Sequence, residues 1–405
     1  MAKPHPPAGD DRATPGGADP LGHPEFVGPY RILGVLARGG MGMVYVAEQT
    51  EPVRRRVAVK VIKAGMDTRE VVARFEAERQ ALAVMDHPGI AKVLDGGATD
   101  EGRPYFVMEL VKGIAITEYC DTHRLSTRER LLLFVDVCHA VQHAHQKGVI
   151  HRDLKPSNVL VMLQDGKPVP QVIDFGIAKA LATPLTEQSL FTQAGHAVGT
   201  PAYMSPEQAD PSALDVDTRT DIYSLGVMLY ELLVGRLPVY PAVMGLPIYM
   251  ARLAQRETAP NTPSGKLITL GADAGAVSAQ RRSDPRTLRR ELQGDLDWIV
   301  MTAMEPDRTR RYETVNGLAM DINRHLNDDT IAARPPSTMY RLSRFARRNR
   351  LAVAAGATVV AALVIGLSAA GVSLVRARRA EALARQEAET SSQVAKFLTE
   401  LFRVS

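Results

Sequence analysis

The feature that most constrains the 405-residue chain is a long uncharged stretch near its C-terminus. Residues 351–375 read LAVAAGATVVAALVIGLSAAGVSLV, with no Asp, Glu, Lys or Arg in 25 positions. A helix of that length spans roughly 37 Å, more than the ~30 Å hydrocarbon core of a bilayer. The alternative is a buried helix in a large soluble core, but such helices seldom run uncharged this far. We therefore predict a transmembrane helix over 351–375, with the lipid bilayer as a partner.

Arginines flank this segment on both sides. Those before it are Arg341, Arg344, Arg347, Arg348 and Arg350, and those after it are Arg376, Arg378 and Arg379. Five against three is close to a tie, so the positive-inside rule orients the helix only weakly. Because the segment lies far from the N-terminus, it is not a cleavable signal peptide.

The overall composition is that of an ordinary globular protein, with 45% hydrophobic and 23% charged residues. This excludes a wholly disordered chain, a collagen and a coiled-coil rod. Lys and Arg number 49 against 45 Asp and Glu, a net charge of +4. A nucleic-acid binder would more often have a strong basic excess, so we expect no nucleic-acid partner. The two cysteines, Cys120 and Cys138, cannot form a disulfide framework and fit a reducing compartment.

Strand patterns come first along the chain and helical patterns later. Residues 1–29 hold seven Pro and five Gly, with almost no apolar periodicity, and are predicted to be a disordered tail. The predicted strands are two within 31–48, one at 54–63 and one at 105–111; the predicted helices are 69–85, 127–148 and 221–235. This order indicates an α+β fold with two lobes. Residues 256–287, rich in Pro, Gly, Ala and Ser, are predicted to be an irregular surface loop.

Two closely spaced motifs, HRDLKPSNVL at 151–160 and IDFGIAK at 173–179, supply the strongest chemical signal. Asp153, Asn158 and Asp174 offer hard oxygen ligands, which suit Mg²⁺ and its bound phosphates. Asp153 could also accept a proton from an attacking hydroxyl, and Lys155 could neutralise charge on a transferring phosphoryl group. The alternative is a set of unrelated acidic loops, which the spacing and order disfavour.

Weaker signals precede these motifs. In ARGGMGMV, residues 37–44, the glycines at 39, 40 and 42 would let the backbone approach phosphates closely. Lys60 ends the apolar strand VAVK, and Glu78 lies on the following predicted helix. Taken singly, these could be a plain glycine-rich hairpin, a solvated lysine and part of a charged face.

Taken together, ARGGMGMV, VAVK, HRDLKPSN, DFG and SPE resemble, in order, the signature set of a Ser/Thr protein kinase over residues 30–326. The resemblance implies a bilobal fold, with a β-rich N-lobe over 30–110 and a helical C-lobe over 111–330. It implies transfer of the ATP γ-phosphoryl group to Ser or Thr hydroxyls of protein substrates, with ATP and Mg²⁺ as cofactors. Lys155, and Thr200 in GTPAYMSPE, are similar to the Ser/Thr type rather than the tyrosine type.

The resemblance also implies a role for each matching residue. The catalytic residues would be Asp153 and Lys155, and the magnesium ligands Asn158 and Asp174. The ATP-binding residues would be Leu36, Gly39, Gly40, Gly42, Val44, Ala58, Lys60, Glu78, Met108, Glu109, Val111 and Leu160. The structural residues would be Arg152, Thr200, Glu207, Asp221 and Arg311. Within these sets Lys60 would pair with Glu78, and Glu207 with Arg311.

The segment from Asp174 to Glu207 resembles an activation loop. In similar kinases an arginine such as Arg152 meets a phosphate on this loop, and the charge-assisted bonds order it. The expected phosphorylation sites are Thr192, Ser189 and Thr186, in that order of preference. Membrane anchoring would concentrate neighbouring copies and favour autophosphorylation in trans. The alternative is that these hydroxyls are ordinary polar loop groups.

The region around the uncharged segment is similar to that of receptor-like bacterial Ser/Thr kinases. Residues 331–350 would be a basic juxtamembrane linker, with the kinase in the cytoplasm and a single pass through the cell membrane. Residues 376–405 would form a short extracytoplasmic helix. Its apolar residues at helical spacing favour packing or self-association, and thus a homodimer.

Two other functions compete with an active protein kinase. A pseudokinase scaffold is favoured only by Ala37, which stands where the family has its first loop glycine; the presence of Lys60, Asp153 and Asp174 opposes it. A soluble small-molecule kinase is opposed by the SPE motif and by the uncharged segment 351–375.

Overall fold

The structure is a computed structural model that describes residues 24–39, 42–63, 85–175, 201–210, 216–258, 260–335, 344 and 349–403. The chain forms two compact units. The first comprises Met1–Asn327 with Ile331–Pro335, and the second comprises Asp328–Thr330 with Pro336–Ser405. Each unit is described by itself below.

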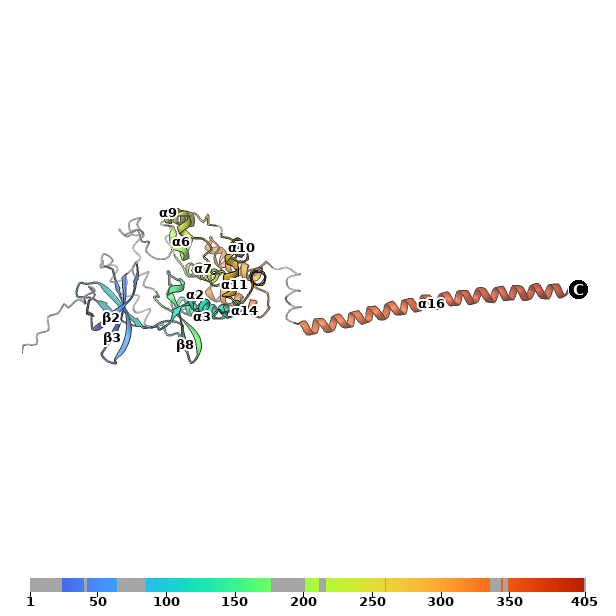
Figure 1. The fold of residues 1–405 in the computed structure, drawn as a ribbon, viewed down its shortest axis with the longest axis horizontal. Coiled ribbons are helices and arrows are strands. Elements are labelled where there is room, and N and C mark those ends of the chain that lie inside the picture. Colours follow the sequence, from blue (N-terminus) through green and yellow to red (C-terminus); the bar gives the residue numbers. More distant parts are fainter. Residues whose placement is uncertain are drawn as a thin grey trace, which may run out of the picture. The chain divides into compact units, whose positions relative to one another are not determined.

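The first unit begins with a six-stranded antiparallel sheet (Figure 1). Its strands, in spatial order, are β1 (Phe26–Val27), β2 (Tyr30–Gly39), β3 (Gly42–Gln49), β4 (Arg55–Ile62), β6 (Pro104–Glu109) and β5 (Val93–Ala98). Strand β4 is buried on both faces: Val57 and Val59 belong to a small cluster, whereas Ala58 and Ile62 belong to the main core. A strand covered on both sides has a continuous β-branched run in place of alternation, as here.

The predicted tail is wrong over its last residues. Strand β1 pairs with β2 through Phe26 opposite Arg31 and Val27 opposite Tyr30. Val27 and Tyr30 are 3% and 2% exposed, so they bury apolar surface on the sheet. Two adjacent apolar residues give no periodicity, which is why the sequence pattern did not reveal this strand.

Helices dominate the rest of the first unit. A small sheet joins β7 (Ile114–Ala115), β8 (Val159–Gln164) and β9 (Lys167–Val172). The longer helices are α2 (Ile116–Thr122), α3 (Thr127–Gln146), α7 (Arg219–Val234), α9 (Leu246–Ala254), α13 (Asp295–Ala303) and α14 (Val315–Leu326). Short helical turns are η1 (Pro156–Asn158), η2 (Pro201–Tyr203), α6 (Pro206–Ala209), α8 (Pro241–Met244) and η3 (Arg308–Arg310).

Helices α3 and α7 confirm two predicted helices, and their ends have local causes. Ser126 and Glu129 form a reciprocal capping box at the start of α3. Gly235, at φ 68°, ends α7 in the left-handed conformation that glycine adopts at little cost. Almost every residue of α7 is buried, and it packs against α13 and α3.

The predicted surface loop at 256–287 is wrong, because most of it is helical. Helices α10 (Pro263–Thr269) and α11 (Asp273–Ala279) lie within it, and α12 (Pro285–Leu292) begins near its end. Thr262 and Asp284 cap α10 and α12 through their side chains, and a proline follows each cap at the first helical position. Such short helices have too few turns to produce a clear periodic pattern.

Two buried arginines join this helical segment to α7. The Arg281 guanidinium, 2% exposed, donates from Nε to Leu233 O at 2.6 Å and from Nη2 to Leu232 O at 2.9 Å. Arg130, 1% exposed, donates from Nη1 to Leu232 O at 3.1 Å and from Nη2 to Gln280 O at 2.9 Å. The carbonyls at the end of α7, which have no partner within a helix, are thereby satisfied. These hydrogen bonds tie the helical segment around Gln280 and Arg281 to the C-terminal end of α7.

The second unit is dominated by one helix, α16 (Arg350–Arg403), of 54 residues (Figure 1). The segments predicted as separate helices, 351–375 and 376–405, are continuous through its described length. By length and composition alone, the stretch Leu351–Lys396 could cross a membrane, and its most apolar window is not buried.

Candidate active site

One face of the six-stranded sheet carries the predicted nucleotide-contacting side chains. Val44 lies opposite Lys60, and Ala58 lies opposite Met108. Cross-strand partners share a face, as do residues two apart on a strand, so all four side chains point the same way. Leu36 lies where the β2–β3 register shifts, between Val35 and Ala37, and is 53% exposed.

The glycine-rich turn joins β2 to β3. Gly42 has φ 153°, and a Cβ there would overlap the carbonyl oxygen of Val61, so the position accepts only glycine. Gly39 has open space around it, and Ala37 is exposed. A methyl group at 37 therefore causes no crowding within the described chain.

Lys60 contacts the aspartate of the DFG motif. Its Nζ lies 2.9 Å from Asp174 Oδ2, across 114 residues of sequence. The residues are nearly buried, with side-chain exposures of 9% for Lys60 and 18% for Asp174. The pair joins the sheet to the end of β9, so two motifs far apart in the sequence meet at one site.

The HRD loop brings Asp153, Lys155 and Asn158 together. Lys155 Nζ donates to Asp153 Oδ2 at 2.7 Å. Asn158 Nδ2 donates to the Asp153 carbonyl at 2.8 Å and to Asp153 Oδ2 at 3.3 Å. The Asp153 side chain stays 29% exposed, so a hydroxyl from outside can reach the carboxylate.

Asp221, at the start of α7, anchors the backbone of the HRD loop. It is fully buried and accepts the backbone N–H groups of His151 and Arg152, each at 2.8 Å. His145 Nε2, on α3, donates to Asp221 Oδ2 at 2.7 Å. Burial alone would raise the pKa of Asp221, but the bonds from His145 and His151 lower it overall, so the carboxylate stays ionised. The motifs gave no indication that His145 belongs to this network.

His151 itself is a core residue next to the DFG motif. Its Nε2 donates to Ile173 O at 2.9 Å, and its ring lies 4.7 Å from the Phe175 ring, centroid to centroid. These contacts join the HRD loop to the strand end that carries Asp174.

Glu207 of the SPE motif pairs with Arg311, as the resemblance implied. Arg311 donates from Nη1 to Glu207 Oε1 at 2.6 Å and from Nη2 to Oε2 at 2.8 Å. Thr220 Oγ1 also donates to Glu207 Oε1, at 2.8 Å. Burial opposes ionisation of Glu207, but these bonds lower its pKa overall. A bidentate buried pair of this kind joins the end of the predicted activation loop to the residue that follows η3.

The donor set at Asn158 and Asp174 fits Mg²⁺. The hydrogen bonds above use Asn158 Nδ2 and Asp174 Oδ2, so Oδ1 of each residue has no such bond to the described side chains and could serve as a ligand. Within the described ranges there is no cluster of three or more His, Cys, Asp or Glu suited to a metal. One carboxylate and one amide are too few for an all-protein cage, but they suit Mg²⁺ that also binds nucleotide phosphates and water.

Several predicted residues lie outside the described part of the chain. They are Gly40, Glu78, Thr186, Ser189, Thr192 and Thr200. The predicted helix at 69–85 lies outside it as well, apart from Met85. Of the remaining nucleotide contacts, Glu109 ends β6 and is exposed, whereas Val111 and Leu160 are half-buried.

Comparison with known proteins identifies the family. Residues 30–267 match the family described as "Protein kinase domain". The kinase Pkn1 of Myxococcus xanthus is 41% identical over 52% of this chain and 29% of its own length. PknB of Mycobacterium tuberculosis (strain H37Rv) is 32% identical over 81% of this chain and 47% of its own. Both are named serine/threonine-protein kinases. The chain therefore belongs to the protein kinase family, among the bacterial members of eukaryotic Ser/Thr type.

Solved structures agree on the fold. The crystal structure of the Mycobacterium tuberculosis PknI kinase domain matches with a TM-score of 0.51 at 24% identity, covering 74% of this chain and 97% of that one. The small β-rich lobe and the larger helical lobe are thus those of a protein kinase. The chain spans less than half the length of the two curated relatives.

Proposed function

We propose that the chain is a membrane-anchored Ser/Thr protein kinase. The observation that carries the proposal is that the loop of Asp153, Lys155 and Asn158 lies next to the Lys60–Asp174 pair, because Ile173 N donates to Asn158 O at 2.9 Å. In the proposed reaction, a substrate hydroxyl oxygen forms a bond to the γ-phosphorus of ATP while the bond to the β–γ bridging oxygen breaks. The hydroxyl proton passes to Asp153, and ADP leaves.

Each group in the site has a part in this step. Lys60 would hold the α- and β-phosphates, and Val44, Ala58 and Met108 would contact the adenine. Lys155, 2.7 Å from Asp153, would stabilise negative charge on the transferring phosphoryl group. Mg²⁺ would neutralise phosphate charge, held by the remaining oxygens of Asn158 and Asp174.

Replacing Lys60 with methionine tests the proposal. Methionine keeps much of the side-chain length but removes the ammonium that positions the phosphates, so transfer to a protein substrate should fall about 10²-fold or more. The measurement is incorporation of ³²P from labelled ATP. The matched control is Lys63→Met, an exposed lysine three residues further on, which should keep the parent rate. Equal, measurable rates in all three proteins would mean that Lys60 does not position the phosphates, and background incorporation in all three would favour a binding scaffold over a kinase.

We further propose that phosphorylation at Thr192, Ser189 or Thr186 orders the activation loop, with Arg152 as the phosphate ligand. Arg152 lies beside Asp153 at φ 66°, and its buried Nε has no hydrogen-bond partner among the described residues. A buried unpaired guanidinium N–H is costly, and a phosphate would satisfy it.

Alanine at all three hydroxyl positions should abolish this activation. We expect mass spectrometry of the active parent to find phosphate on at least one of the three residues. The triple variant should phosphorylate a protein substrate more slowly, by about tenfold or more if charge-assisted bonds order the loop. Pre-treatment with a phosphatase should slow the parent to the same rate. A triple variant as fast as the parent excludes loop phosphorylation as the switch.

The membrane anchor is proposed on the apolar part of α16, with the kinase lobes in the cytoplasm. We also propose the predicted division into an N-lobe at 30–110, a C-lobe at 111–330, a linker at 331–350, a span at 351–375 and an outer segment at 376–405. The support for the span is its uncharged length and the exposure of its large apolar side chains, such as Leu363 at 61% and Leu367 at 73%. Exposed apolar surface on this scale is unfavourable in water.

Fractionation tests the anchor. The full chain should sediment with membranes and require detergent, whereas a chain that ends at Asn349 should stay in the soluble fraction. The matched control is the full-length double variant Leu363→Arg/Leu367→Arg. Each arginine costs about 2.5–3.5 kcal/mol at the centre of a span, so this variant should lose its membrane association. Full-length parent protein in the soluble fraction without detergent would contradict the anchor.

A further inference from the structure

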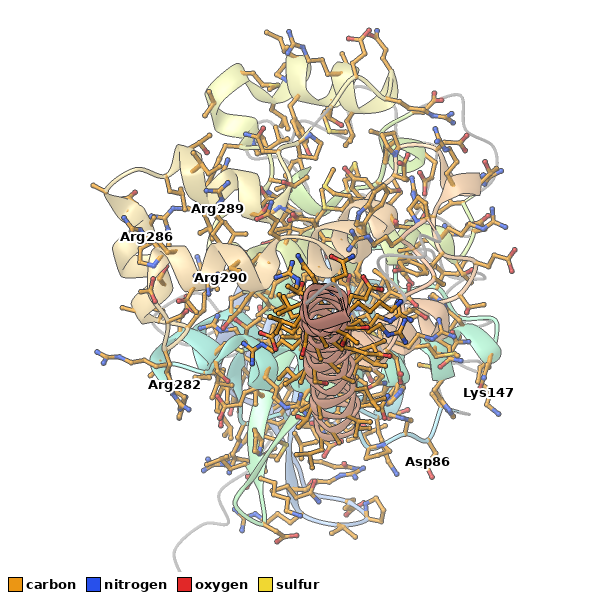
Figure 2. All side chains as sticks on the ribbon, turned by 90° about the vertical axis from the view of Figure 1, so that its right-hand side faces the viewer. Asp86, Lys147, Arg282, Arg286, Arg289 and Arg290 are labelled. Carbon is orange, nitrogen blue, oxygen red and sulfur yellow. The ribbon has the colours of Figure 1, made fainter. Side chains whose placement is uncertain are left out.

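Helix α12 presents an exposed face made of arginine. Arg286, Arg289 and Arg290 lie at spacings of three and four, which places them on one side of a helix. Figure 2 labels the three side chains on this helix. All three are exposed, whereas Leu288 and Leu292, on the opposite side, are fully buried.

A pocket lies beside this arginine face. Its volume is about 440 Å³, and it is lined by Leu267, Ile268, Pro285, Arg286, Arg289, Arg290 and Gln293. Ile268, on α10, is 59% exposed, so the pocket offers an apolar wall beside basic groups. Its size lies within the range of roughly 300–1,000 Å³ found for ligand sites.

The three arginines have no ion pair within the part of the chain that the structure describes. The two carboxylates nearest in sequence do not pair with these guanidinium groups: Asp284 accepts the backbone N–H of Arg286, and Glu291 accepts from Thr127 Oγ1. The neighbouring Arg282 differs, because its Nη1 lies 3.2 Å from Glu129 Oε2. The pocket rim therefore carries three exposed guanidinium groups that no described carboxylate pairs with directly.

We propose that the pocket between α10 and α12 docks a protein segment that carries phosphoserine or phosphothreonine next to an apolar residue. Guanidinium groups bind phosphate through paired, charge-assisted hydrogen bonds, and a cluster of them suits a dianion. The apolar wall at Leu267 and Ile268 would take the neighbouring side chain. The inference rests on the proposed function in one respect, the source of the ligand, because a Ser/Thr kinase generates segments that carry phosphoserine or phosphothreonine.

A membrane surface fits this site less well. A helix that lies on a bilayer inserts exposed apolar side chains between the lipids, but the leucines of α12 are buried in the core. The Arg281 contacts with Leu232 and Leu233 hold the segment in place, so the site is formed before a ligand binds.

The chain itself contains a suitable probe sequence. Residues 186–196 read TEQSLFTQAGH, in which Leu190 and Phe191 precede Thr192. The experiment measures fluorescence anisotropy of this peptide, with and without phosphate at Thr192, against the full chain in a neutral detergent. The phosphopeptide should bind about tenfold more tightly or better, and its binding should weaken as salt increases.

The variant Arg286→Gln/Arg289→Gln/Arg290→Gln should lose that preference. Its control is Lys147→Gln/Arg252→Gln/Arg310→Gln, which removes the same charge from exposed positions on other elements and should bind as the parent does. Unchanged melting temperatures would show that both variants fold. ATP turnover, measured separately, distinguishes failure of docking from failure of the proposed kinase activity.

Three results would overturn the proposal. The first is equal binding of the two peptides, which would mean that phosphate is not recognised. The second is tight phosphopeptide binding that the α12 variant retains, which would place the site elsewhere. The third is displacement of the peptide from both the parent chain and the control by micelles doped with phosphatidylglycerol, which would indicate a lipid site.

Discussion

Replacing Asp153 with asparagine is expected to reduce phosphoryl transfer by about 10²–10⁴-fold while leaving ATP binding intact. The amide has the same shape, and its oxygen can still accept from Lys155 and Asn158, which lie 2.7 Å and 3.3 Å from Asp153 Oδ2. It cannot accept a proton from the substrate hydroxyl. The measurements are ³²P incorporation into a protein substrate and affinity for a fluorescent ATP analogue.

The control for this variant makes the same change at an exposed carboxylate. Asp165 lies in the turn between β8 and β9 at φ 51°, a conformation that asparagine tolerates. Asp165→Asn should retain full activity. If Asp153→Asn transfers phosphate as fast as Asp165→Asn, the assignment of Asp153 as proton acceptor is wrong.

The second large effect concerns stability. Arg311→Met should lower the free energy of unfolding by roughly 3–5 kcal/mol, because Glu207 is left as a buried, unpaired charge. Arg311 also donates to Arg219 O at 2.9 Å and lies over the Tyr223 ring at 5.0 Å, so several contacts are lost together. Urea unfolding of the full chain in neutral detergent, followed by fluorescence of the single Trp298, measures the loss.

The pH dependence of this variant separates charge from packing. In the parent, the pKa of Glu207 is lowered, so its pairing stabilises the fold above the unfolded pKa of about 4.3 and is lost as pH falls through the folded pKa. In Arg311→Met the hydrogen bond from Thr220 remains, but burial is the largest influence and should raise that pKa, so the carboxylate destabilises the fold at neutral pH. The deficit should therefore shrink between pH 7 and pH 4. A loss of unfolding free energy that stays constant with pH would point to packing instead. An equal loss in Arg310→Met, at the exposed neighbouring residue, would show that the effect is not specific to the Glu207–Arg311 pair.

Features set by local chemistry were predictable from the sequence. Strands β2, β3, β4 and β6 and helices α3 and α7 lie where the patterns indicated them. The Glu207–Arg311 pair formed as the resemblance implied, across 104 residues. Motif residues are recognisable because phosphate and magnesium chemistry requires particular side chains in a particular order.

Features held by distant contacts were not predictable. Strand β5 reads VLDGGA, and its two glycines conceal a strand that exists because β6 pairs with it. Helices α10 and α11 are too short to be stable alone and depend on Arg281, which lies 48 residues from its partner Leu233. The bond between His145 and Asp221 joins residues 76 apart, and no local pattern marks it.

The length of α16 has a mechanical consequence for the proposed membrane-anchored kinase. The helix continues from the uncharged segment to Arg403 without a break, so about 28 residues, or roughly 40 Å, would project beyond the bilayer as a rigid rod. A helix that is uninterrupted at the membrane surface would transmit rotation and axial displacement directly to Arg350 at its other end. If two copies pair as the sequence predicts, a change in how the two projecting helices pack against each other would alter the distance between the two Arg350 ends.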